Sequence, residues 1–229
     1  MPNWTPSNPH DSDYARYVRT RELFALQKTP ADRANPDELL FQVMHQSAEL
    51  WMQEILSCLS RAQSAMPDDG LTAVRMFVRA RLVLDHLAAS LPILETMPPA
   101  RYHEVRVTLG RGSGQDSPGF NSILAAPAGL WGSFHPMLKK TGVSLIELHR
   151  APQKHPLLFE VVQSMMAFDE SFQKWRYGHF QLVRREIGDQ VRSLKGVPAA
   201  KLVHGTTESL FPELWDVINE LTRETSAEY

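Results

Sequence analysis

Residues 158 to 188 read LFEVVQSMMAFDESFQKWRYGHFQLVRREIG, and this stretch decides the fold. Its apolar residues recur three to four positions apart, which is the spacing of one face of an α-helix. The pattern predicts a single long helix from about residue 157 to about residue 187. Such a helix must bury its apolar face against other elements, so the rest of the chain has to supply them.

Three further segments show the helical spacing. The first runs from about 37 to 65, and it begins where Pro36 and two acidic residues favour a helix start. Asp68, Asp69 and Gly70 break the helical pattern after it. The other two run from about 71 to 91 and from about 211 to 225. Residues 13 to 27 carry an irregular helical pattern, and residues 100 to 109 predict a short helix or turn.

Residues 110 to 136 hold six glycines and three prolines, which predicts an irregular loop. No strand-like alternation persists for more than about five residues. The expected fold class is therefore all-α, a bundle of long helices with one glycine-rich crossover loop. Residues 1 to 12 are polar and proline-rich and are expected to form a flexible arm, with residues 13 to 229 as a single helical domain.

Composition excludes several classes of protein. A chain of 229 residues, 43% of them hydrophobic, can bury a full core, and its net charge of -2 gives no sign of a nucleic-acid partner. No apolar run reaches the roughly 18 residues of a membrane span, and the N-terminus is unlike a signal peptide. The single cysteine, Cys58, excludes an internal disulfide, fits a cytoplasmic location and is expected to be a small buried hydrophobe.

His179 lies on the apolar seam of the long helix, and its neighbours on that face include Phe172, Trp175, Arg176, Leu182 and Val183. A zinc site would need further ligands at short spacing, and none is present. Two interpretations remain open. The residue is either a core histidine bonded to a backbone carbonyl, or the single axial ligand of a heme, whose porphyrin supplies the other four nitrogens.

His45 lies in DELLFQVMHQSAELWMQEIL, residues 37 to 56, with Phe41 one turn before it and Glu49 one turn after. It could be structural and bonded to Glu49. Alternatively, two histidines on aromatic helix faces could flank a flat apolar cofactor, one holding iron and the other facing the substrate. The loop LGRGSGQDSPGF, residues 109 to 120, allows a plain connection or an anion-binding nest, and it lacks the flanking strand of a phosphate loop.

Six blocks, in order along the chain, resemble the tryptophan 2,3-dioxygenase superfamily of heme-dependent aromatic oxygenases. They are YARYVRTRELFALQ, DELLFQVMHQSAELWMQEIL, LPILETMPPARYHEVRVTLG, SPGFNS, KWRYGHFQLVRREIG and LFPELWDV. The resemblance implies a b-type heme and oxidation of an aromatic substrate by dioxygen or hydrogen peroxide.

The resemblance also implies residue roles. His179 matches the heme-iron ligand, and His45 matches the distal histidine that contacts the substrate ring. Phe41 matches a pocket aromatic, Ser193 matches the residue that contacts the substrate ammonium, and Trp175 and Leu91 lie where the family contacts heme. Tyr14, Tyr17 and Val18 match pocket residues that reach a neighbouring subunit, which implies a homodimer or homotetramer.

Several positions depart from the family pattern. Ala126 stands where the family has the arginine that binds the substrate carboxylate, VRSLKGV (residues 191 to 197) replaces a glycine-rich loop, and Leu91 replaces a tryptophan. The chain is also shorter between the crossover and the heme helix. These departures favour an oxygenase of a small indole or phenol. The alternatives are a tryptophan 2,3-dioxygenase proper, a peroxide-using tyrosine hydroxylase, and a heme sensor or carrier without turnover.

Overall fold

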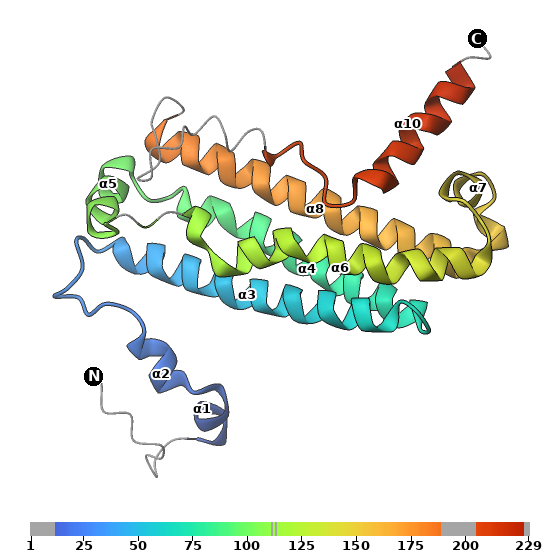
Figure 1. The fold of residues 1–229 in the computed structure, drawn as a ribbon. Coiled ribbons are helices and arrows are strands. Elements are labelled where there is room, and N and C mark those ends of the chain that lie inside the picture. The colour runs from blue at the N-terminus through green and yellow to red at the C-terminus, as the bar shows by residue number, and fades with distance from the viewer. Residues whose placement is uncertain (1–11, 111, 113, 189–204, 227–229) are drawn as a thin grey trace.

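Four long helices form the body of the protein (Figure 1). The computed structural model describes residues 12–110, 112, 114–188 and 205–226. The long helices are α3 (Glu38–Ala65), α4 (Gly70–Leu94), α6 (Pro118–Thr141) and α8 (Pro156–Ile187). α4 packs against both α3 and α8, and α6 packs along α3. No strand occurs among the residues that the structure describes, so the expected all-α bundle is confirmed.

The bundle core is apolar and continuous between these helices. Phe77 of α4 contacts Phe168 of α8 and Phe211, with ring centroids 6.0 and 6.5 Å apart. Cys58 is fully buried in the same core, as a small hydrophobe would be. In the part of the chain that the structure covers, no helix is both long enough and apolar enough to span a bilayer.

The region from 110 to 136 is not the irregular loop that its composition predicts. Ser117 caps a new helix by accepting a hydrogen bond from the Phe120 amide (3.1 Å), and Pro118 occupies the first turn, where its missing N–H costs nothing. α6 then continues through Gly129, where an added Cβ would lie 3.0 Å from the Gln63 side chain of α3. This glycine serves close helix packing, so the glycine-rich crossover is confined to the residues before Ser117.

Shorter helices flank the bundle. They are α1 (Asp13–Val18), α2 (Thr20–Ala25), α5 (Pro99–Thr108), α7 (Leu145–Arg150) and α10 (Pro212–Ser226). Arg19, with a φ of 59°, breaks the irregular N-terminal pattern into α1 and α2, and both helices lie apart from the bundle in Figure 1. The predicted arm, residues 1 to 12, lies outside the described residues except for Ser12, whose side chain caps α1.

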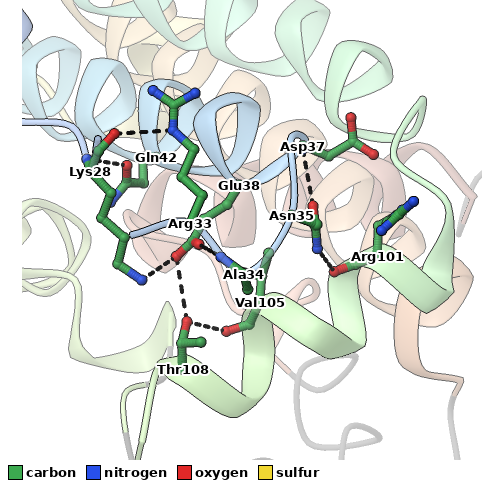
Figure 2. A network of polar contacts seen from close by, with 10 residues as sticks. All are labelled: Lys28, Arg33, Ala34, Asn35, Asp37, Glu38, Gln42, Arg101, Val105 and Thr108. Atoms are coloured by element: carbon green, nitrogen blue, oxygen red, sulfur yellow. Dashed lines mark hydrogen bonds and ion pairs between the residues drawn. The ribbon is translucent and has the colours of Figure 1, made fainter. Parts of the chain in front are cut away.

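A polar network fixes α5 against the start of α3, as Figure 2 shows. The buried Glu38 carboxylate accepts hydrogen bonds from Lys28 Nζ (2.5 Å), the Ala34 amide (2.6 Å) and Thr108 Oγ1 (3.4 Å). Asn35 Nδ2 donates to the Arg101 carbonyl at 2.9 Å. Because these bonds join residues far apart in sequence, they set the position of α5 over one end of the bundle.

The C-terminal segment is anchored on α8 by a single buried carboxylate. Asp169 Oδ2 accepts hydrogen bonds from the amides of Leu210 (2.9 Å) and Phe211 (3.1 Å) and from Trp215 Nε1 (2.9 Å). One turn further along α8, Gln173 Nε2 donates to the Glu208 carbonyl at 2.5 Å. The segment before α10 is therefore tied to the helix that carries His179.

Candidate functional site

α3 presents His45 with a defined tautomer. Its Nδ1 lies 2.8 Å from the Phe41 carbonyl one turn earlier, and the two rings lie 4.0 Å apart. A carbonyl can only accept, so the proton is on Nδ1, and Nε2 of the neutral ring is a free acceptor. His45 is exposed to solvent in the single chain, but the protein around it still lowers its pKa by desolvation. The Phe41 carbonyl and Glu49 oppose this shift.

Glu49 does not hydrogen-bond to His45. Its Oε2 accepts from the Gly119 amide at 3.0 Å, and its Oε1 accepts from the Ser117 hydroxyl. The carboxylate therefore joins α3 to the first turn of α6. The Gly119 amide is thereby occupied and is not available to bind an anion.

α8 presents His179 without a hydrogen-bond partner among the described residues. Trp175, one turn before it, stacks on the imidazole with ring centroids 5.7 Å apart and planes 19° apart. Burial lowers the pKa of His179 to about 4, and the charge of His45 acts in the same direction. The ring is therefore neutral at neutral pH, which is the form that ligates a metal. A positive charge on His45 therefore acts on His179, so the two histidines lie at the same end of the bundle.

An apolar cluster from four helices lies beside this pair. It is built on Leu94, Met97 and Leu182, with Leu40, Phe41, Met44, Leu91 and Tyr102 packed against them. Leu91 also lies against α8 beside the histidine, since a Cβ added at Gly178 would be 3.0 Å from Leu91 Cδ1. Phe41, Leu91 and His179 are thus brought to one end of the bundle, between α3, α4 and α8.

The donor set at this end fits heme and does not fit a bare metal ion. Among the described residues, no three His, Cys, Asp or Glu side chains are grouped so that they could hold a metal by themselves. His179 is partly buried and makes no hydrogen bond to the described residues, so a ring nitrogen is available to an outside ligand. A porphyrin iron needs one such nitrogen and an apolar setting, and both are present around His179.

Trp175 lies between this end and the main core. Its ring is buried and stacks near Phe172, with centroids 6.1 Å apart, and near Phe120, at 5.8 Å. Arg176 lies over the Phe120 and Phe172 rings, at 6.0 and 5.6 Å. This cation–aromatic contact was not predicted from the sequence. The aromatic residues beside Arg176 were the only feature that could have indicated it.

The remaining predicted residues lie elsewhere. Tyr14 and Tyr17 on α1 are 71% and 90% exposed, so a single chain does not bring them to the histidines. Val18 is exposed on the same helix. Ser193 lies outside the described residues. Ala126, at the position of the family's arginine, packs partly buried against the main core from α6.

Comparison with known proteins agrees with this geometry. The profile of the family described as tryptophan 2,3-dioxygenase matches residues 6–124, just over half of the 229-residue chain. The chain is similar to the tryptophan 2,3-dioxygenase of Herpetosiphon aurantiacus, with 27% identity over 91% of this chain and 98% of the relative. It is also similar to those of Erythrobacter litoralis (26%; 90% and 97%) and Ruegeria pomeroyi (26%; 92% and 94%).

Proposed function

Because this chain belongs to the tryptophan 2,3-dioxygenase family, we propose that it oxidises a small aromatic substrate, an indole or a phenol, at a heme held by His179. Members of this family are heme-dependent enzymes that oxidise aromatic substrates, so the chain is a heme oxygenase of that class. The observation that carries the finer proposal is that His45 and His179 both lie beside one apolar cluster, His45 against Phe41 and His179 next to Gly178, which Leu91 approaches.

The cofactor in this proposal is heme b, ligated by His179 and flanked by Leu91 and Trp175. When bound, the heme supplies activation of dioxygen or peroxide. Covalent attachment through cysteine is excluded for this chain, because its only cysteine, Cys58, is buried in the core between other helices. The cofactor would therefore be held by its ligand and by apolar contacts.

His45 is proposed to orient the substrate and to take up its proton. With Nδ1 committed to the Phe41 carbonyl, Nε2 can accept a hydrogen bond or a proton from a ring N–H or O–H. Phe41, packed on the imidazole, would hold the substrate ring by apolar contact. The low pKa of His45 keeps this nitrogen unprotonated at neutral pH, so the acceptor is ready before the substrate binds.

The site is proposed to be completed by a second copy of the chain. Tyr14, Tyr17 and Val18 lie exposed on α1, apart from the bundle, and large apolar side chains in such a place favour a partner. The proposed assembly is a homodimer or homotetramer, with α1 near a neighbour's pocket. Sedimentation should show an oligomer, and a fully active monomer would contradict this assignment.

Turnover per bound heme tests the proposed function. The purified protein is supplied with heme and given indole, tryptophan or tyrosine with dioxygen or peroxide, and products are identified by mass. His45→Ala should keep heme and lose about 100-fold or more in turnover per heme, as expected for a lost proton acceptor. His86→Ala is the matched control, since His86 is an exposed helix-borne histidine that also contacts an aromatic ring. Equal turnover of both variants would remove His45 from the site.

A further inference from the structure

Glu186 is a buried acid whose burial nothing in the described chain explains. It lies on α8 and is only 6% exposed, and neither carboxyl oxygen has a hydrogen-bond partner. An unpaired polar group in such a place costs free energy, and an ionised one costs much more. A buried carboxyl without hydrogen-bond partners destabilises the fold unless a group from outside the folded chain bonds to its oxygens.

Glu186 lies at the far end of the apolar cluster that His45 borders. His179, Leu182 and Glu186 follow one another at helical spacing on a single face of α8, and Leu182 is one of the buried residues of that cluster. On the other side, Glu186 is close enough to Tyr102 of α5 to reinforce the rise in the pKa of that phenol, which burial mainly causes.

Ring contacts complete the connection from Tyr102 back to His45. Tyr102 lies 6.1 Å from the Phe41 ring, and Phe41 lies 4.0 Å from the His45 ring. An acid and a proton-accepting imidazole therefore stand at the two ends of one aromatic and aliphatic cluster. The cluster between them is the kind of surface that an aromatic ring covers.

Among the described residues, no arginine hydrogen-bonds to the Glu186 carboxylate. Arg185 pairs instead with Glu95 at the end of α4, at 3.9 Å. Arg184 and Arg185, with Gln181, line an open groove of about 490 Å³ on the adjacent face of α8. Burial raises the pKa of Glu186, Arg185 opposes the rise, and Glu95 adds to it. A positively charged donor would stabilise the ionised carboxylate and would also satisfy its two oxygens.

We propose that Glu186 is the cation-binding end of the substrate pocket, and that the preferred substrate is an arylalkylamine without a carboxylate. This inference rests on the proposed function, in which His45 receives the ring. An ammonium group brings both the charge and the N–H donors that the two orphan oxygens lack. A substrate carboxylate at this place would instead be repelled by the Glu186 carboxylate. The site therefore favours an amine over an amino acid.

Ligand binding to the heme-loaded protein tests this proposal. Tryptamine, indole-3-propionate and indole are titrated, and the change in the heme spectrum gives each Kd. The wild type should bind tryptamine more tightly than indole, and indole-3-propionate least tightly. Glu186→Gln should weaken tryptamine binding by about tenfold or more, as a lost charge-assisted contact does, and leave indole binding unchanged. Glu170→Gln, which changes an exposed acid on the same helix, is the matched control and should leave all three affinities as they are.

Three outcomes would overturn the proposal. One is an unchanged tryptamine Kd in Glu186→Gln, and another is an equal loss for indole and tryptamine. The third is a wild type that prefers the propionate. If indole still binds in any of these cases, the proposed function stands and only the assignment of Glu186 fails. If no aromatic probe changes the heme spectrum of the wild type, the proposed function fails and the extension fails with it.

A pH titration of the wild type keeps the proposal falsifiable if Glu186→Gln does not fold. An ammonium binds the ionised carboxylate, so the protonated form must first release its proton to solvent. Tryptamine affinity should therefore fall as pH drops through the raised pKa of Glu186, beyond any fall shared by indole. Glu95, Arg185 and Tyr102 are the other ionisable groups beside Glu186, and His45 would affect both ligands alike. Parallel pH profiles for the two ligands would refute the proposal.

Discussion

Replacing Asp169 by alanine should destabilise the protein strongly, because this carboxylate is fully buried and its Oδ2 alone serves three donors. The amides of Leu210 and Phe211 and the indole N–H of Trp215 all bond to its Oδ2, at 2.9 to 3.1 Å. A buried donor left unsatisfied costs about 1–3 kcal/mol, so three donors set a range of about 3–9 kcal/mol. Water can reach part of this segment once it loosens, so we expect a loss of about 3–5 kcal/mol in the free energy of unfolding.

Urea unfolding of the heme-free protein, followed by circular dichroism, measures this loss. Glu170→Ala is the matched control: the next residue is exposed and makes only an i, i+4 ion pair with Lys174, at 2.8 Å. It should stay within about 0.5 kcal/mol of the wild type. If Asp169→Ala unfolds within about 1 kcal/mol of the wild type, the anchoring of the C-terminal segment on α8 is wrong.

Further predictions concern other parts of the bundle. Gly119→Ala would place its Cβ 2.6 Å from Met52 Cβ, so thermal unfolding should show a loss of about 1–3 kcal/mol, and an unchanged Tm would contradict the tight contact. Burial alone would raise the pKa of Glu38, but bonds from Lys28, Ala34 and Thr108 lower it overall. Its contribution to stability is therefore present above the unfolded-state pKa and lost as pH falls through the folded-state pKa. Glu38→Gln should flatten the acid limb of a plot of urea midpoint against pH. Burial, helped by Glu54, raises the pKa of Cys58 to about 11, so a thiol reagent at neutral pH should label it only in the unfolded protein.

The long helices were predictable from sequence because their periodicity is local. The predicted ends of the helix that became α8 lie within one residue of Pro156–Ile187. α6 was missed because glycine and proline counts carry no information on packing. Pro118 lies in a first turn, where proline is favoured, and Gly129 lies where α6 approaches Gln63. Only the position of α3 decides that this glycine belongs in a helix.

The candidate site was predictable in part, because the helix face on which a single residue lies also follows from local spacing. His45 and His179 each stand out on one helix face, but their proximity depends on how α3, α4 and α8 pack. Glu49 illustrates the limit, because its helical spacing to His45 favoured a bond between them, while a segment about 70 residues away takes both oxygens. Glu186 gave no signal, since it follows two arginines on what reads as a solvated face, and only packing at the α5 end buries it.

The heme content of His179→Ala tests the central assignment most directly. The variant and the wild type are loaded with heme under the same conditions, and the Soret band and iron per chain are measured after gel filtration. We expect the variant to lose most of its heme, or to keep it with a shifted Soret band that added imidazole returns toward the wild-type position. Full heme with an unchanged spectrum would show that another residue ligates the iron, and His179 would then be a core histidine.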